Sequence, residues 1–303
     1  MKILITGGTG FVGQRLIKKL YADGHDLVIL TRNPEKARLN ESTGANFHRW
    51  DGISEDVPAE AYQGVEAVIN LMGENIANKR WSDNQKIRLQ KSRIDATKKL
   101  VEGCEKHLEK PLKVFISASA SGFYPVNTGE TLDESSNAGS GFLSELCQEW
   151  EKATEGLTKT ERKIISRTGV ILGPESGALN KLLPIFKMAA GGPIGSGNMV
   201  MSWIHVEDMV KAISEWLVND KYNGVYNMVA PNPVTNKVFT KALGKAVRKP
   251  AIFPVPSFML KLIMGEMSTI VLDSQKLIPK RLIDDGFQFN HPEIEEALID
   301  LVR

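Results

Sequence analysis

Short apolar runs alternate with longer amphipathic stretches along the first two thirds of the chain. Runs of strand length lie at residues 1–6, 26–31, 65–71, 113–117 and 163–167. Apolar residues at helical spacing occur at residues 14–22, 83–104, 141–157 and 206–218. Strands that alternate with helices form βαβ units, so the pattern predicts an α/β fold with a doubly wound parallel sheet.

The pattern changes after about residue 167, where glycines and prolines become dense and the alternation fades. A short apolar run at residues 225–228 is expected to rejoin the first sheet, and the chain from about 235 is mostly helical. We therefore predict a large domain over residues 1–168, to which residues 200–230 return. Residues 169–303 should form a smaller, mixed but mainly helical domain that acts as a lid or substrate domain.

Charge and cysteine content narrow the class of protein. The 38 basic and 36 acidic residues nearly cancel, so we expect neither a nucleic-acid nor a membrane partner. Cys104 and Cys147 provide no metal-ligand spacing, and we expect no metal. With few cysteines and an opening strand in place of a leader, we expect a cytoplasmic protein that binds a small molecule.

A glycine-rich segment, GGTGFVG at residues 7–13, joins the first strand to the first helix. Gly7 allows a tight turn, Gly10 lets the backbone approach a pyrophosphate, and Gly13 permits close packing of helix on strand. The amides at the helix N-terminus, together with the helix dipole, then face the phosphates. This context predicts a Rossmann-type dinucleotide site; the alternative is a glycine turn without a cofactor.

The end of the second strand predicts which nicotinamide cofactor binds. An acidic residue there would bond a ribose hydroxyl and repel a 2′-phosphate, but the sequence is Thr31-Arg32-Asn33, with no carboxylate before Glu35. Arg32 can pair with a 2′-phosphate, so NADP is favoured over NAD. The alternative for Arg32 is a solvated surface arginine.

Several motifs together resemble the extended form of the short-chain dehydrogenase/reductase superfamily. They are GGTGFVG at 7–13, NLMG at 70–73, SASASGFY at 117–124 and WIHVED at 203–208. The chain is most similar to an atypical, epimerase-like subgroup with a small C-terminal domain. The resemblance implies that the pyrophosphate is held by Gly7, Thr9, Gly10, Phe11, Val12 and Gly13. It also implies that Leu71, Met72 and Gly73 line the cofactor's ribose and that the segment from Ser117 to Ser119 lies under the nicotinamide.

The catalytic pair of that superfamily, Tyr-x-x-x-Lys, is missing. Its members use the lysine to lower the pKa of the tyrosine, which exchanges a proton while hydride moves. Alignment of the helix on Glu151 places Leu143 and Cys147 at the tyrosine and lysine positions. Ser119 can represent the superfamily's serine, and Arg93 stands where an asparagine is usual.

Other groups would have to replace the pair if the chain is an enzyme. Tyr124 is expected to face the nicotinamide and serve as the acid, or else to be a packed aromatic residue. Cys147 is either a thiol acid or a core residue. Arg93 either binds an anionic substrate group or pairs with Glu134 or Glu151. His205 would border the substrate and orient a backbone carbonyl.

Two functions remain open from the sequence. The first is an NADP-dependent oxidoreductase or epimerase acting on a small polar substrate, with Ser119 and Tyr124 handling the proton. The second is a non-catalytic NADP-binding protein that regulates a partner or senses redox state. A monomer and a homodimer are equally compatible with the sequence.

Overall fold

A seven-stranded parallel sheet forms the centre of the computed structural model, which describes residues 1–39, 43–175 and 177–302. The strand order is β11-β7-β5-β4-β1-β2-β3, and every neighbouring pair is parallel. This arrangement confirms the predicted Rossmann-type sheet. The strands are β1 (Lys2–Thr6), β2 (Asp26–Thr31), β3 (Asn46–Arg49), β4 (Ala67–Asn70), β5 (Val114–Ala120), β7 (Lys163–Thr168) and β11 (Gly224–Met228).

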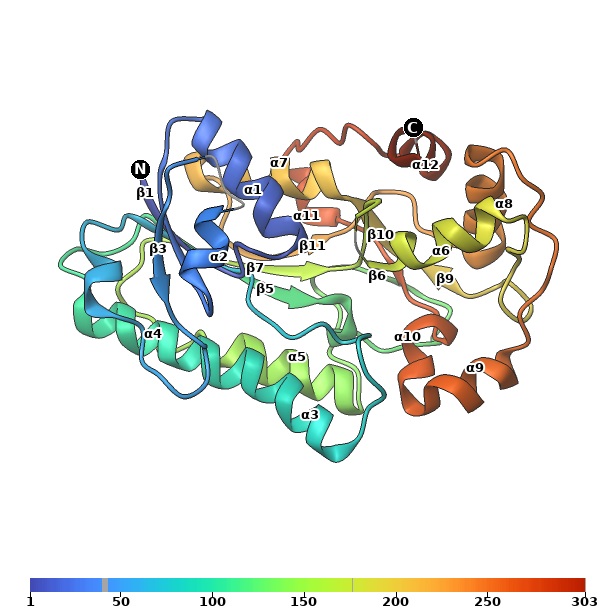
Figure 1. The fold of residues 1–303 in the computed structure, drawn as a ribbon, viewed down its shortest axis with the longest axis horizontal. Helices are drawn as coiled ribbons and strands as arrows, with labels where there is room; N and C mark the ends of the chain where they lie inside the picture. The colour runs from blue at the N-terminus through green and yellow to red at the C-terminus, as the bar shows by residue number, and fades with distance from the viewer. Residues whose placement is uncertain (40–42, 176, 303) are drawn as a thin grey trace.

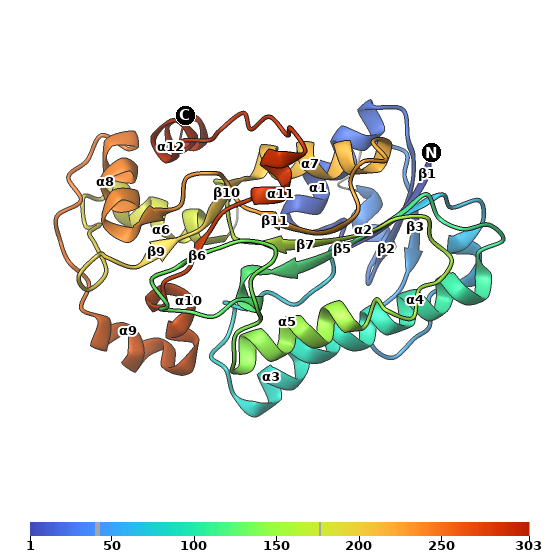
Figure 2. The ribbon, with the colours of Figure 1, turned by 180° about the vertical axis from the view of Figure 1, so that it is seen from behind.

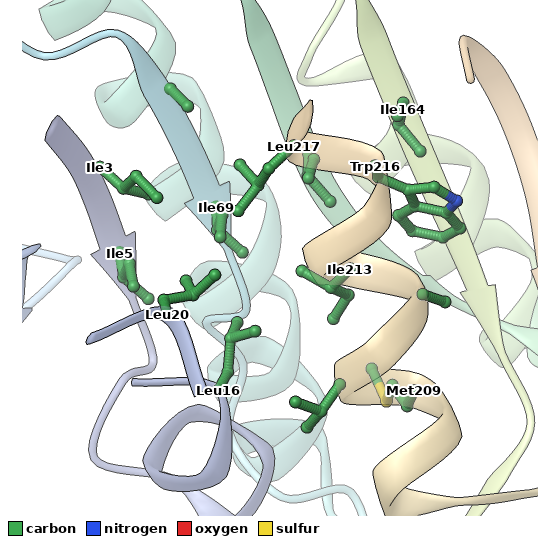
Figure 3. Close-up of a cluster of buried hydrophobic side chains, with 14 of the residues drawn as sticks. Ile3, Ile5, Leu16, Leu20, Ile69, Ile164, Met209, Ile213, Trp216 and Leu217 are labelled. Carbon is green, nitrogen blue, oxygen red and sulfur yellow. The ribbon is translucent and has the colours of Figure 1, made fainter. Parts of the chain in front are cut away.

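Helices cover both faces of the sheet (Figures 1 and 2). One face carries α1 (Phe11–Ala22) and α7 (Val206–Val218), and the other carries α3 (Asp83–Gln90), α4 (Ala96–His107) and α5 (Phe142–Lys152). Side chains alternate between the two cores, as they must along a strand. Ile3 and Ile5 pack with α1 and α7 (Figure 3), whereas Leu4 packs with α4 on the opposite side. Burial on both faces explains why β1 and β2 are apolar over most of their length.

Part of the predicted helix at 83–104 is a wide turn. Between α3 and α4 the chain forms the π-helical turn η2 (Lys91–Asp95), which carries Ser92 and Arg93. Single π-helical turns inserted in α-helices often occur at functional sites. The sequence pattern did not reveal this turn, because it leaves the helical run uninterrupted.

The C-terminal part is mainly helical, as predicted, and lies beyond the carboxyl ends of the strands (Figure 1). Its core joins three helices, α6 (Gly177–Lys187), α8 (Asn236–Ala246) and α12 (Ile294–Val302). The remaining helices are α2 (Pro34–Leu39), α9 (Ser257–Met264), α10 (Thr269–Leu272) and α11 (Lys280–Asp284). Short strands pair as β6 (Thr131–Leu132) with β13 (Lys276–Leu277), β8 (Val170–Leu172) with β10 (Trp203–His205), and β9 (Val200–Met201) with β12 (Val234–Thr235). Three 3₁₀ turns complete the described elements, η1 (Ala59–Tyr62), η3 (Ser121–Phe123) and η4 (Gly265–Ser268).

The chain crosses between its two parts more than once. Strand β11 pairs with β7, so the run at 225–228 rejoins the first sheet, and α7 packs on α1. A second return lies near the C-terminus: α11 packs on β11, and Leu282 and Phe287 join the core beneath α7. The domain boundary at residue 168 stays a prediction. No helix in the described ranges is both long and apolar enough to cross a bilayer.

Candidate functional site

The glycine-rich turn connects β1 to α1 with very little free space on its inner side. Gly7 has φ +70°, and a Cβ there would lie 2.7 Å from the carbonyl oxygen of Leu71. A Cβ at Gly13 would overlap the carbonyl oxygen of Gly7, so any larger residue separates α1 from the turn. Gly10 is exposed, and a Cβ there would meet only Gly7 O, at 3.1 Å. The tight side of the turn therefore faces the protein, and its open side is the N-terminus of α1.

No side chain caps that N-terminus, where Gly10 is the N-cap residue. The first amides of α1 are therefore free to bind an anion. Strand β1 lies between β2 and β4, and the sheet order reverses at this point. In open parallel sheets, dinucleotides bind outside the carboxyl ends of the strands at such a reversal.

Residues 71–73 follow β4 and lie against the turn. A Cβ at Gly7 would meet the carbonyl of Leu71, and a Cβ at Gly52 would overlap the side chain of Met72. Gly73 is exposed and lies beside the guanidinium of Arg93. The structure thus brings together the two segments, 7–13 and 71–73, that the sequence assigned to the cofactor.

Arg32 lies on the surface directly after β2. Its side chain has no hydrogen bond or ion pair with any residue in the described ranges. The first carboxylate after it, Glu35, belongs to the first turn of α2. An unpaired guanidinium beside the adenosine end of the predicted site matches the chemistry of a 2′-phosphate.

Ser117 belongs to a buried hydrogen-bond network below the turn. Thr6 Oγ1 donates to Asn70 Oδ1 at 2.7 Å, and Asn70 Nδ2 donates to Ser117 Oγ at 3.2 Å. Asn70 Nδ2 and Trp150 Nε1 also donate to Thr97 Oγ1. The network ties β1, β4 and β5 to the helices below. Because Ser117 is fully buried within it, the structure favours a structural role, and its part in cofactor binding stays a prediction.

Ser119 and Tyr124 belong to a second buried network, centred on an ion pair. Arg167 donates two bonds to Glu151, at 2.9 and 2.8 Å, and Ser119 Oγ donates to the same carboxylate at 2.6 Å. The Tyr124 hydroxyl accepts from Arg167 Nη1 at 3.0 Å and donates to Asn227 Oδ1 at 2.7 Å.

Tyr124 is 1% exposed, and its burial raises the pKa of its phenol, although Arg167 opposes the shift. Its hydroxyl therefore already donates one hydrogen bond and accepts another, and its raised pKa disfavours ionisation. This arrangement favours the packed-aromatic alternative over the predicted acid.

Cys147 is also buried. It follows Leu143 by one turn on the face of α5 that leads to Glu151, and this face packs on Gly122. Burial raises the pKa of the Cys147 thiol to about 12, so the thiol is protonated near neutrality. The core alternative for Cys147 is favoured over the thiol acid.

Arg93 pairs with neither of the carboxylates considered for it. Its guanidinium donates to the carbonyls of Glu74 and Leu89, at 2.9 and 3.3 Å, and lies over the Trp150 ring. Glu151 pairs with Arg167, and Glu134 accepts from the backbone amides of Asn227 and Arg281. The ion-pair alternative is therefore wrong, and anion binding by Arg93 stays a prediction. Burial lowers the pKa of Arg93, which indicates that its charge is poorly solvated.

His205 caps a helix and does not orient a carbonyl as expected. Its Nδ1 accepts from the Glu207 amide at 3.1 Å at the start of α7, and its ring stacks on His291. Asp300 lies 3.4 Å from His205 Nε2, so three potential metal ligands converge. However, a neutral ring whose Nδ1 accepts a bond carries its proton on Nε2, which then has no lone pair for a metal. The placement favours a structural role, and a substrate role for His205 stays a prediction.

Comparison with known proteins identifies the family. Residues 3–228 match the model of the NAD dependent epimerase/dehydratase family, and residues 255–301 match a domain of unknown function, DUF1731. The chain belongs to the NAD dependent epimerase/dehydratase family. It is 40% identical to the chloroplastic epimerase family protein SDR39U1 homolog of Arabidopsis thaliana, over 98% of this chain and 86% of that protein. It is 34% identical to the mouse epimerase family protein SDR39U1, over the full length of both.

Solved structures extend the comparison to the fold of the whole chain. Human epimerase family protein SDR39U1 (isoform 2), determined with NADPH, matches with a TM-score of 0.88 and 31% identity, over 100% of this chain and 99% of that one. UDP-glucose 4-epimerase of Thermus thermophilus, in complex with NAD, matches with a TM-score of 0.77 at 19% identity, over 100% and 98%, which shows the fold alone. These matches confirm the predicted atypical, epimerase-like subgroup.

Sequence reasoning missed the buried ion pair that organises the site region. Glu151 entered only as the residue on which the helix is aligned and as a possible partner of Arg93, and neither Arg167 nor Asn227 was considered as a partner. The available signal was an arginine inside a predicted strand of the sheet, because a charge in a strand buried on both faces requires a buried partner.

Proposed function

We propose that this epimerase-family protein binds NADP(H) without the proton-coupled hydride transfer of its family, and acts as a regulatory or redox-sensing cofactor-binding protein. The observation that carries the proposal is that the groups expected to transfer the proton are either replaced or already hydrogen-bonded. The tyrosine and lysine positions hold Leu143 and Cys147, and the Ser119 and Tyr124 hydroxyls are bonded inside the Glu151–Arg167 network. Loss of acid–base catalysis alone typically costs a factor of about 10²–10⁴ in rate.

The cofactor part of the proposal is supported by the glycine turn, the open α1 N-terminus and the unpaired Arg32. The human relative of similar fold was determined with NADPH. When bound, NADP(H) would supply hydride chemistry at its nicotinamide. Residues 7–13 would bind the pyrophosphate, Arg32 the 2′-phosphate, and residues 71–73 the ribose.

Calorimetric titration with NADPH and NADH tests the cofactor. We expect NADPH to bind about 10- to 100-fold more tightly, because a charged hydrogen bond contributes about 1.5–3 kcal/mol. Arg32→Asp should abolish that preference, whereas Arg88→Asp, the same change at an exposed site on α3, should preserve it. Equal affinity of the unaltered protein for both cofactors refutes the NADP assignment, and no heat with either refutes the site.

A second candidate, an NADP-dependent oxidoreductase, is favoured by one observation. Arg93 has no carboxylate partner in the described ranges, and it lies beside Gly73 and near Cys147. A cation therefore stands near the position of the family's lysine, where it could bind an anionic substrate group.

Isotope transfer separates the two candidates. NADP⁺ is incubated with UDP-glucose or UDP-glucuronic acid that carries deuterium at C4 of the sugar, and the cofactor is analysed by mass spectrometry for deuterated NADPH. The regulatory proposal predicts no deuterium in the cofactor. Transfer that Arg93→Ala abolishes while NADPH affinity is retained establishes the oxidoreductase instead.

A further inference from the structure

The balanced net charge of the chain conceals an uneven distribution. Residues 235–265 contain six cations and no carboxylate: Lys237, Lys241, Lys245, Arg248, Lys249 and Lys261. All six are exposed. Lys245 pairs with Glu295 of α12, whereas the other five form no ion pair within the described ranges. The expectation of no membrane partner rested on the whole-chain charge and did not consider this segment.

The same segment exposes large apolar side chains. They are Ile252, Phe253, Phe258, Met259, Leu262 and Ile263, and α9 has no buried residue at all. Phe258 is 69% exposed and Leu262 is 76% exposed. At 100° per residue, Phe258, Met259, Leu262 and Ile263 fall on one side of α9, and Lys261 lies at its edge. Clusters of this kind on a protein surface mark an interaction site.

Contacts at both ends of the segment fix its backbone in the position that leaves these side chains exposed. Residues 253–255 pair with residues 191–195: the Phe253 amide donates to Gly191 O, and the Val255 amide donates to Pro193 O. The same loop contacts Lys237 through Gly197 and Ser257 through Gly195. At its other end α9 is fixed by Arg80, which donates to Leu262 O, and by the Lys86–Glu266 ion pair after the helix.

Both ribbon views place α8, α9 and the chain between them at the end of the molecule farthest from the N-terminus (Figures 1 and 2). We define the α8–α9 surface as the six apolar residues together with Lys237, Arg248, Lys249 and Lys261. We propose that the α8–α9 surface docks on an anionic phospholipid membrane, with the apolar side of α9 at the acyl boundary and the cations among the headgroups. An apolar helix face combined with unpaired cations is the composition that interfacial binding requires.

The charge pattern favours a membrane over a second copy of this chain. Two copies joined through this surface would bring the cations of both together, and like charges at an interface oppose association. An anionic membrane instead attracts each cation by about 1 kcal/mol, which is about a fivefold gain in partition per residue.

Co-sedimentation with vesicles tests the proposal on the full chain. We expect binding to vesicles of phosphatidylcholine with 30% phosphatidylserine, little binding to pure phosphatidylcholine, and loss of binding in high salt. Phe258→Ser/Leu262→Ser should remove binding, and Lys237→Gln/Lys249→Gln should weaken it about 25-fold by the fivefold factor per cation. The control pair Leu39→Ser/Val218→Ser, also exposed and apolar but elsewhere, should bind like the unaltered protein.

Circular dichroism establishes that each variant is folded before it is tested. Absence of binding by the unaltered protein, or equal loss in the control pair, overturns the proposal. Sedimentation velocity gives the competing outcome: a dimer that Phe258→Ser/Leu262→Ser dissociates, without vesicle binding, assigns this surface to a second copy.

Discussion

Removal of the Tyr124 hydroxyl separates a structural role from a catalytic one. Tyr124→Phe keeps the ring and deletes one oxygen, which accepts from Arg167 and donates to Asn227. Both partners are buried, at 6% and 0% exposure, so water cannot easily replace the lost bonds. The variant therefore leaves one charged donor and one amide acceptor partly unsatisfied.

The expected loss follows from these two bonds. An unsatisfied buried polar group costs about 1–3 kcal/mol, and charged groups lie at the upper end. Arg167 retains its two bonds to Glu151, so we expect a total of about 2–4 kcal/mol in the free energy of unfolding. Each kcal/mol shifts Tm by about 2–4 °C in a domain of 150–250 residues, and by somewhat less in a longer chain.

Urea unfolding and NADPH titration are measured on the same preparations. We expect Tyr124→Phe to unfold at lower urea concentration with an unchanged NADPH affinity, because Tyr124 faces the network and not the glycine turn. Tyr21→Phe is the matched control, since Tyr21 is exposed on α1 and should change stability by less than about 0.5 kcal/mol. Unchanged stability combined with altered NADPH binding or turnover would refute the reasoning and restore Tyr124 as a site residue.

Two further predictions concern the turn and the α7 cap. Gly13→Ala should abolish measurable NADPH binding in calorimetry, because its Cβ would overlap Gly7 O; retained affinity would show that the turn can widen. Burial and the neighbouring His291 lower the pKa of His205, so below pH about 6.5 the unfolded chain binds a proton that the folded protein does not. Stability should therefore fall with decreasing pH from about 6.5 through the lowered folded pKa. His205→Asn, which can also cap α7, should flatten this fall in thermal unfolding, and an unchanged slope would assign it to other groups.

The sequence was sufficient for the fold because the signals were local. Apolar runs identified six of the seven strands of the central sheet, and the position of α7 was predicted to the residue. Strand β3 was missed because only Phe47 of its four residues is buried, which leaves no periodic signal. The π-helical turn around Arg93 was missed because it preserves the apolar spacing of a helix.

The candidate site was likewise more predictable where its signals were local in the sequence. The backbone part, residues 7–13 and 71–73, follows from glycine chemistry and strand order, and the structure brings these segments together. The side-chain part was less predictable, because partners far apart in sequence decide whether a hydroxyl is available. Tyr124 lies 103 residues from Asn227, and no local pattern indicates that bond.

A final prediction concerns the electrostatic coupling between Arg93 and position 147, where the family's lysine would stand. Lysine restored at position 147 would be buried, and it would lie near the guanidinium that already affects the thiol there. Two cations in one poorly solvated environment repel each other, so removal of one charge should reduce the cost of burying the other. We therefore expect Cys147→Lys to lower the free energy of unfolding by about 3 kcal/mol or more, and Arg93→Asn to recover about 1–3 kcal/mol of that loss in the double variant.

Arg93→Asn alone should be destabilising, because it breaks the bonds to Glu74 and Leu89 and the contact with Trp150. Urea unfolding of the four proteins gives the coupling directly. Strictly additive losses would mean that the two positions do not share one electrostatic environment, and that the charge of Arg93 does not act at the position of the family's lysine.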